Sequence, residues 1–388
     1  MRVMLSAGEA SGDFHGAHLA QALRQQEPAV ELSGMGGPLM AEAGVRLHFD
    51  PTQVSAVGFT EAIVQVRQMR RVLALLTEAM RREAVDVLVA IDLPAFNMRL
   101  VEAARRLGIP AVYYFSPSAW AWGKGRARRV ARSGAHVCAV FPFEADVYRE
   151  AGAKVTFVGH PLLDSVQVDA TQAEIRRELN LDPNLPVIAL LPGSRKQELE
   201  RLLPPMGEAL ALVQAEHPQV QAVLPRSHTV KHVQLDDFAS AHHVVVVEGE
   251  AQRVLAASDV AVVASGTATL EAAMIGTPQV VIYKTSALTY QIAKRLIRIP
   301  HVALPNIVAQ RAVVPELLQD AVNGPNIARH LLALLNDPDE RGRMQNAYQD
   351  IVKRLGGAGA VNRAAQVVLA VGRGDVCPTR GVSAEATK

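Results

Sequence analysis

The sequence predicts an α/β protein built from two Rossmann-like domains that face each other across a cleft. Three observations carry this prediction. Short apolar runs alternate with segments of helical period, as in parallel βαβ units. The apolar runs are continuous, which is typical of strands in a sheet covered by helices on both faces. The alternation stops near residue 164 and then restarts, which divides the 388 residues into two parts of domain size.

Five strands are predicted in the first part, with helices between them. The strands cover residues 2–7, 86–91, 111–115, 136–141 and 154–159. Periodic apolar positions predict helices that start near Gly12, run from Arg99 to Leu107 and run from Glu144 to Ala151. Because helices connect consecutive strands, we expect parallel strands with right-handed crossovers.

Five further strands are predicted in the second part. They cover residues 186–191, 221–225, 243–248, 259–264 and 279–284. A charged helix over Ala170 to Leu179 precedes them, and another helix passes through Glu208 and Val213. We therefore expect domains over residues 1–163 and 164–358, a last helix over 359–372 and a disordered tail over 373–388.

Composition excludes several classes of protein. A formal net charge of +2 gives the chain no strong basic field, so no nucleic-acid partner is predicted. Two cysteines, Cys138 and Cys377, are too few for a disulfide framework or a four-cysteine zinc site. No cluster shows metal-ligand spacing, and the sequence predicts neither a metal site nor a cofactor. His160, at the junction of the two parts, favours a structural role.

The apolar runs are all strand-sized, and none approaches the roughly 20 residues that span a bilayer. The first residues also lack the long apolar stretch of a secretory signal, so we expect a cytoplasmic protein. Two basic segments could still contact anionic lipid or phosphate: residues 54–80, and residues 116–132 with Trp120 and Trp122. The alternative is a surface helix packed on the sheet for residues 54–80, and a solvated helix face for residues 116–132.

The loop after the first strand reads Gly8-Glu9-Ala10-Ser11-Gly12-Asp13. In open parallel sheets ligands bind at the carboxyl ends of strands, and small residues let a ligand approach the backbone closely. The helix that follows offers N–H groups to an anion. The loop lacks the GxGxxG pattern of dinucleotide sites. The alternative is a tight turn in which Ser11 or Asp13 caps the helix.

A carboxylate, Asp92, follows the predicted strand over residues 86–91. At the carboxyl end of a parallel strand it would face the cleft, where it could accept a proton from a substrate hydroxyl. The alternative is that Asp92 caps the next helix, with Pro94 in its first turn.

Two loops in the second part have the features of diphosphate sites. Gly193, Ser194 and Arg195 follow one strand, and the guanidinium can bind phosphate in bidentate fashion. Gly266 and Thr267 follow another strand and lead into a helix. Glu271, on that helix, is suited to accept hydrogen bonds from ribose hydroxyls. The alternative for each loop is an ordinary capping turn.

At these loops the sequence resembles the lipid-A-disaccharide synthase family, whose members are glycosyltransferases of the two-Rossmann GT-B type. The likeness extends to about residue 370 and rests on the order of many separate motifs. These are Ala7–Asp13, Gly34–Gly37 with Met40, Gly58 with Glu61, Asp92 with Phe96-Asn97, Ser116–Ser118 with Trp120 and Trp122, Val158–Leu162, Leu191–Arg195, Ser265–Ala268, Leu304–Asn306 and Glu316–Gln319.

The resemblance implies a reaction and a location. A 2,3-diacylglucosamine unit moves from UDP-2,3-diacylglucosamine to the 6-hydroxyl of 2,3-diacylglucosamine 1-phosphate, with inversion and without a catalytic metal. The products are UDP and lipid A disaccharide 1-phosphate. The family works in Gram-negative bacteria, peripherally on the cytoplasmic face of the inner membrane. In GT-B proteins the last helix commonly returns to the first domain. No feature predicts the oligomeric state.

The resemblance also assigns roles to individual residues. Asp92 matches the essential aspartate of the family, which implies a general base on the acceptor hydroxyl. Arg195 and the Gly266-Thr267 turn would stabilise the departing diphosphate, and Glu271 would hold ribose. The remaining positions implied to line the substrate site are Gly8, Glu9, Ser11, Gly12, Gly193, Ser194, Lys284 and Asn306. At Lys284 some members carry Arg, so the charge is kept without the fork geometry.

Two other functions compete with this one. The first is another UDP-sugar enzyme of the same fold, such as an N-acetylglucosaminyltransferase or a UDP-sugar epimerase. The loop over residues 8–13 and the pair Trp120 and Trp122 argue against it. The second is a nucleotide-sugar binder without catalysis, against which Asp92 argues.

Overall fold

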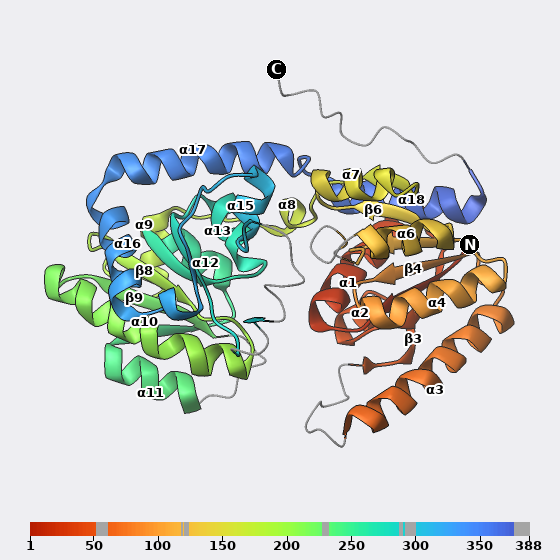
Figure 1. Cartoon of the computed structure of the whole chain (residues 1–388), viewed down its shortest axis with the longest axis horizontal. Coiled ribbons are helices and arrows are strands. Elements are labelled where there is room, and N and C mark those ends of the chain that lie inside the picture. Colours follow the sequence, from red (N-terminus) through yellow and green to blue (C-terminus); the bar gives the residue numbers. More distant parts are fainter. Residues whose placement is uncertain are drawn as a thin grey trace. The chain divides into compact units, whose positions relative to one another are not determined.

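The structure is a computed structural model, drawn in Figure 1, and it describes residues 1–51, 61–117, 119, 124–226, 233–286, 290–291 and 300–375. Contacts within the chain divide it into two units. The first holds Met1–Asp164 and the segment that starts at Leu355, and the second holds Ser165–Arg354. Each unit is built around one parallel sheet, which confirms the predicted pair of Rossmann-like domains.

The sheet of the first unit has the order β3-β2-β1-β4-β5-β6-β7. Its strands are β1 (Arg2–Ala7), β2 (Glu31–Met35), β3 (Arg46–Phe49), β4 (Val87–Ile91), β5 (Ala111–Tyr114), β6 (His136–Ala139) and β7 (Lys154–Phe157). The helices are α1 (Ala10–Gln26), α2 (Pro38–Glu42), α3 (Glu61–Arg82), α4 (Pro94–Arg106), α6 (Lys124–Ser133), α7 (Pro142–Glu150) and α18 (Ala360–Arg373), with α8 (Leu162–Ser165) where the chain passes to the second unit.

Helices cover both faces of this sheet. Successive residues of a strand point to opposite faces, so each buried strand contributes apolar side chains to both layers. On one face Leu88 and Ala90 of β4 belong to a buried cluster with apolar side chains of α3, α4, α6 and α7. On the other face Val87 and Ile91 approach Gly372 of α18 and Gly16 of α1. Figure 1 shows α18, drawn in blue, beside the elements of the first unit, although it comes from the end of the described chain.

The sheet of the second unit has the order β10-β9-β8-β11-β12-β13. Its strands are β8 (Val187–Leu191), β9 (Gln221–Arg226), β10 (Val244–Glu248), β11 (Val260–Ala264), β12 (Gln279–Tyr283) and β13 (Glu316–Leu318). The helices are α9 (Gln172–Glu178), α10 (Lys196–Glu216), α11 (Val233–His242), α12 (Ala251–Ala257), α13 (Ala268–Ile275), α15 (Leu304–Ala309), a 3₁₀ turn η2 (Gln319–Ala321), α16 (Gly324–Asn336) and α17 (Pro338–Arg354).

The strand order gives each unit one topological switch point, where the chain reverses its direction of travel across the sheet. In the first unit the point lies between β1 and β4, and in the second between β8 and β11. Helices leave these neighbouring strands toward opposite faces, which opens a crevice at the carboxyl ends where ligands bind in this fold. The loops singled out from the sequence therefore flank the two switch points.

All ten predicted strands are observed, but the sequence pattern missed β2, β3 and β13. These strands are short, and charged or small residues interrupt their apolar character. In β2, Gly34 has φ +149, and a Cβ there would overlap the Leu5 carbonyl of β1. Close approach of two backbones therefore accompanies the burial of Leu32 and Met35 in this strand.

The C-terminal segment joins the first unit earlier than the predicted boundary at residue 359. The Leu355 carbonyl accepts a hydrogen bond from His160 N–H at 2.9 Å. The Arg363 guanidinium donates to carbonyls of Val158, Gly356, Gly357 and Ala358. These bonds, which a helical pattern cannot reveal, tie residues 355–359 to the first unit. Helix α18 also includes Arg373, which was predicted to belong to the tail; residues 376–388 lie outside the described part of the chain.

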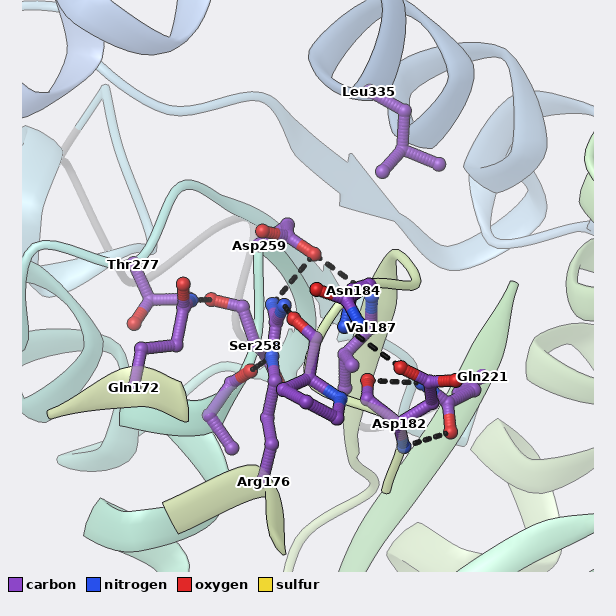
Figure 2. Close-up of polar contacts among 12 residues, drawn as sticks. Gln172, Arg176, Asp182, Asn184, Val187, Gln221, Ser258, Asp259, Thr277 and Leu335 are labelled. Carbon is purple, nitrogen blue, oxygen red and sulfur yellow. Dashed lines mark hydrogen bonds and ion pairs between the residues drawn. The ribbon is translucent and has the colours of Figure 1, made fainter. Parts of the chain in front are cut away.

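Buried charge at the amino-terminal edge of the second sheet has a structural role. Figure 2 shows Arg176 of α9 reaching Asp259, with Nη2 donating to Oδ2 at 2.8 Å. Its Nε donates to the Ala257 carbonyl at 2.7 Å, and Val187 N–H donates to the same Asp259 oxygen. The Arg176 guanidinium is buried and the Asp259 carboxylate is partly exposed, and the hydrogen bonds of this pair hold the first residues of β8 and β11 in place.

Candidate active site

The loops after β1 and β4 meet at the switch point of the first unit. A Cβ on Gly8 would overlap the Leu93 side chain, so a glycine is needed for this approach. Gly12 is buried against Ala7, whereas Glu9 and Ser11 are exposed. The small residues Gly8 and Gly12 therefore allow the loops after β1 and β4 to pack closely against each other.

The alternative interpretation, in which Ser11 or Asp13 caps α1, was wrong. The N-cap of α1 is Glu9. The carboxylate of Asp13 instead accepts three hydrogen bonds at the start of α2, from the N–H groups of Gly37, Leu39 and Met40. It thus caps a helix that is distant in sequence, which no local pattern indicates.

Asp92 lies at the carboxyl end of β4 in an unusual backbone conformation. Asp92 has φ 51 and Leu93 has φ 44, both in the left-handed region that few side chains adopt. The N-cap of α4 is Leu93, so the interpretation of Asp92 as the cap was wrong. Strain of about 1 kcal/mol or more persists only where surrounding contacts hold it.

Asn97 supplies such contacts, and the sequence analysis gave it no role. Its side chain is fully buried, and Nδ2 lies 2.7 Å from the carbonyl of Asp92 and 3.1 Å from that of Ile91. The same amide joins β1, since Nδ2 lies 3.1 Å from the Ser6 carbonyl and Oδ1 accepts from the Ser6 hydroxyl at 2.7 Å. A usable signal existed: Asn97 shares a helical stripe with apolar residues of α4, and a buried amide needs partners.

The electrostatics of Asp92 suit proton transfer. Burial raises the pKa of this carboxyl, and the negative charge of Glu9 raises it further. A hydrogen bond from Leu93 N–H opposes the increase in pKa. A carboxyl whose pKa is displaced toward neutrality is a stronger base than an ordinary aspartate once it is ionised.

In the second unit the loop after β8 contains Gly193, Ser194 and Arg195, all exposed. Glu198 Oε2 accepts hydrogen bonds from the N–H groups of Ser194 at 3.1 Å and Arg195 at 3.2 Å. This is the capping turn that the sequence analysis left open. Because Glu198 already satisfies two N–H groups, the Arg195 guanidinium is the stronger anion-binding feature of this loop.

The loop after β11 lies beside it, because β8 and β11 are paired. Gly266 and Thr267 are exposed, and Thr267 is the N-cap of α13. Glu271, in the first turn of α13, accepts a hydrogen bond from Gln252 at 3.1 Å. Burial raises the pKa of Glu271, and the bond from Gln252 opposes this. Lys284 follows β12, the next strand of the sheet.

Asn306, which the resemblance placed at the substrate site, is buried and bonded to its own unit. Its side chain is 1% exposed, and Oδ1 accepts from Val313 N–H at 2.7 Å and Val314 N–H at 2.9 Å. Its Nδ2 donates to the Val314 carbonyl and to Glu316 Oε1. These bonds use its donors and acceptors to shape the turn between α15 and β13.

The basic segments are only partly described. Trp120, Trp122 and residues 52–60 lie outside the described residues. In α6, Arg129 pairs with Glu102 at 2.8 Å, as on a solvated helix face. In α3, Val72 and Leu76 are buried among apolar residues, while Arg70 and Arg71 are exposed.

Within the described ranges no group of three or more His, Cys, Asp or Glu side chains could hold a metal ion. Within the same ranges, every helix is too short or too polar to cross a bilayer.

Comparisons with known proteins agree with this organisation. A family model described as lipid-A-disaccharide synthetase matches residues 3–371. The lipid-A-disaccharide synthases of Syntrophus aciditrophicus and Myxococcus xanthus are 42% and 40% identical to this chain over 370 residues. Each alignment covers 95% of this chain and 97% of the relative.

Solved structures of low identity share the fold. UDP-GlcNAc 2-epimerase from Neisseria meningitidis bound to UDP-GlcNAc has a TM-score of 0.60 at 14% identity, covering 92% of this chain and 99% of that one. Acinetobacter baumannii MurG has a TM-score of 0.59 at 16% identity, covering 95% and 99%. Since the family model and the relatives match over nearly the whole length, the chain belongs to the lipid-A-disaccharide synthase family.

Proposed function

We propose that the protein is an inverting glycosyltransferase of lipid A biosynthesis. It transfers 2,3-diacylglucosamine from UDP-2,3-diacylglucosamine to the 6-hydroxyl of 2,3-diacylglucosamine 1-phosphate, and UDP leaves. Family membership supports the UDP-sugar chemistry. The observation that carries the mechanism is Asp92, a half-buried carboxylate with raised pKa at the switch point of the first unit.

Asp92 is the general base in this mechanism. As the acceptor oxygen bonds to the anomeric carbon from one face, the bond to the diphosphate oxygen breaks on the other, which inverts the centre. The hydroxyl proton passes to the Asp92 carboxylate, and the electron pair of the broken bond leaves with UDP. The raised pKa of Asp92 favours acceptance of this proton. Gly8, Glu9, Ser11 and Gly12 belong to the same crevice and would contact the acceptor side.

The second unit binds the donor. The Arg195 guanidinium and the Lys284 ammonium would neutralise the diphosphate, and the N–H groups around Gly266 and Thr267 would donate to its oxygens. Donors aimed at the leaving group lower the barrier because charge develops there as the glycosidic bond breaks. Glu271 would accept hydrogen bonds from ribose. Gly193 and Ser194 let the phosphates approach, whereas Asn306 would act through the turn that it shapes.

The protein acts peripherally, at the cytoplasmic face of the inner membrane, in this proposal. Both substrates carry acyl chains, which partition into lipid. Helix α3 presents exposed Arg67, Arg70 and Arg71, together with Leu75, which is 47% exposed. Arginines beside an apolar side chain are suited to an anionic membrane surface.

The first experiment measures UDP release from UDP-2,3-diacylglucosamine with and without 2,3-diacylglucosamine 1-phosphate. We expect release that depends on the acceptor, and a decrease of roughly 100-fold or more in kcat for Asp92→Asn. The matched control is Asp86→Asn, at the other end of the same strand, where the carboxylate accepts from Arg2 N–H. This control should retain kcat within about 2-fold.

Each competing function predicts a different result. Turnover without the acyl acceptor would indicate another UDP-sugar enzyme. Tight UDP binding without turnover would indicate a nucleotide-sugar binder. Acceptor-dependent release that survives Asp92→Asn would keep the transferase and exclude Asp92 as its base.

A further inference from the structure

Phe115, at the end of β5, is the centre of an aromatic stack in the first unit. Its φ is 56, so this bulky residue occupies the left-handed region that it would ordinarily avoid. The His15 ring of α1 stacks on the Phe115 ring, with centroids 4.0 Å apart and planes 22° apart. The His160 ring, from the segment after β7, meets it edge-on at 6.1 Å.

The backbone of Phe115 is bonded to that of Asp92. Asp92 N–H donates to the Phe115 carbonyl at 3.2 Å. The two residues follow neighbouring strands whose last pair is Ile91 and Tyr114, and both are left-handed. Such a conformation is unfavourable for a bulky residue, so contacts of the side chain must retain it. For Phe115 these are the ring contacts with His15 and His160, together with that of its neighbour Tyr114.

Both imidazoles are neutral at physiological pH. Burial, with a smaller contribution from nearby His18, lowers the pKa of His15 to about 4. Burial lowers the pKa of His160 to about 3, with a smaller contribution from His15. The two rings therefore contact Phe115 as uncharged aromatic plates. Stacked and edge-on aromatic pairs stabilise a structure beyond the apolar area that they bury, so the two ring contacts can offset backbone strain at one residue.

We propose that His15 is a positioning residue for Asp92, acting through the ring and backbone of Phe115. The stack holds Phe115 in its left-handed conformation, and the Phe115 carbonyl in turn holds the Asp92 backbone at the carboxyl end of β4. This inference rests on the proposed role of Asp92 as the base, but its structural part, the coupling of His15 to the Asp92 N–H, stands apart from catalysis.

The test compares His15→Leu, which has a side chain of similar size but no planar ring, with His15→Phe, which keeps a planar aromatic ring. His18→Leu is the matched control, since His18 is on the same helix but contacts Phe14 rather than Phe115. For His15→Leu we expect kcat to fall roughly 10- to 100-fold, because a small displacement of a base has effects of this size. KM for the donor should stay within about 2-fold, since the donor loops lie in the other unit. His15→Phe and His18→Leu should remain within about 3-fold of wild type in kcat.

Hydrogen exchange at the Asp92 amide supplies a readout that does not need turnover. In His15→Leu the amide should exchange about 10-fold faster or more, while His15→Phe keeps the wild-type rate. Unchanged exchange in His15→Leu would overturn the inference, as would a His15→Phe variant as impaired as His15→Leu. If wild type shows no acceptor-dependent release, the proposed function fails, and the exchange rates still decide whether His15 positions Asp92.

Discussion

In the first unit Asp92 is held by buried side chains, whereas in the second unit the loops at the equivalent switch point are exposed. Asn97 and the Phe115 carbonyl bond the backbone around Asp92. By contrast, Gly266 and Thr267 lie on the surface, and the residues before α10 are ordered mainly by their own Glu198. The six strands of the second sheet follow the same order as the first six of the first sheet, so the difference comes from side chains rather than topology.

The difference matches the two roles proposed for these sites, proton transfer and diphosphate binding. A general base must be placed within a few tenths of an ångström and must have a displaced pKa, and both need a rigid, buried surrounding. A diphosphate carries its own charge, and it can order exposed N–H groups and a flexible guanidinium when it binds. We therefore expect substitutions in the first unit to change stability and kcat together, and those in the second to change UDP affinity.

The largest effect on the free energy of unfolding is expected for Asn97→Ala. The two N–H bonds of the amide are shared among the carbonyls of Ser6, Ile91 and Asp92, so its loss leaves at least two of these groups short of a donor, and each buried unsatisfied group costs about 1–3 kcal/mol. The free energy of unfolding should fall by at least about 3 kcal/mol, and kcat by at least 10-fold where the protein is folded. Urea unfolding and the UDP-release assay measure the two quantities.

The control for Asn97 is Asn323→Ala in the second unit. Asn323 caps α16 through a bond from Asn326 N–H, so its loss should cost about 1 kcal/mol and leave kcat unchanged. A variant Asn97→Ala with normal kcat would show that Asp92 does not need this support, and the contrast between the units would be lost.

Glu144 extends the comparison to a second buried polar group of the first unit. It is 3% exposed, its Oε1 accepts from the Ser116 hydroxyl at 2.7 Å, and its Oε2 accepts from Val140 N–H at 3.0 Å. Burial raises the pKa of Glu144 to about 7, from 4.5. The folded state thus binds this proton more tightly than the unfolded state, so its contribution to stability decreases as pH rises from about 4.5 through about 7.

For Glu144→Gln we expect this contribution to disappear. Relative to the variant, wild type should lose about 2 kcal/mol of unfolding free energy between pH 5.5 and 8.5. The quantity to measure is the difference in unfolding free energy between wild type and Glu144→Gln. The lowered pKa values of His15, His136 and His160 make stability increase with pH in the acid range, and this effect cancels in the difference. Glu102→Gln, at an exposed pair with Arg129, should give a flat difference. A flat difference for Glu144→Gln as well would mean that this carboxyl titrates normally.

Sequence patterns predicted the parts of the fold that depend on local chemistry. The strands β4, β8 and β11 are fully buried, and their continuous apolar runs mark them plainly. A carboxylate that directly follows such a run, as Asp92 does, can be placed at the carboxyl edge without knowing the topology.

The remaining features depend on contacts between residues distant in sequence. Asn97 bonds Ser6 across 91 residues, and Asp13 caps a helix that begins 25 residues later, at Pro38. No local period reports such pairs. The hydrogen bonds of Asn306 could not be predicted for the same reason, since its partner Glu316 belongs to a strand of only three residues that the pattern also missed.

Two glycines of the second unit separate support of a loop from binding of a ligand. Gly193 has φ +96, and a Cβ there would overlap Glu198, so Gly193→Ala should cost about 1–2 kcal/mol of unfolding free energy. Among the described residues, a Cβ on Gly266 meets no heavy atom within 4 Å, so Gly266→Ala should stay within about 0.5 kcal/mol. Calorimetric titration with UDP should show weaker binding for both variants. Unchanged UDP affinity in Gly266→Ala would remove this turn from the donor site.

The smallest effect is expected for Arg195→Lys. The Arg195 side chain is 75% exposed and lies 3.4 Å from Glu198 Oε1, so it adds little to stability. The free energy of unfolding should therefore change by less than about 0.5 kcal/mol. Lysine keeps the charge but loses the bidentate fork, so Kd for UDP should rise about 3-fold, and about 10-fold in Arg195→Gln. If either variant lost more than about 1 kcal/mol of stability, Arg195 would be a supporting residue like Asn97. If Kd stayed unchanged in both, the diphosphate would be held by the turn after β11 and Lys284 alone.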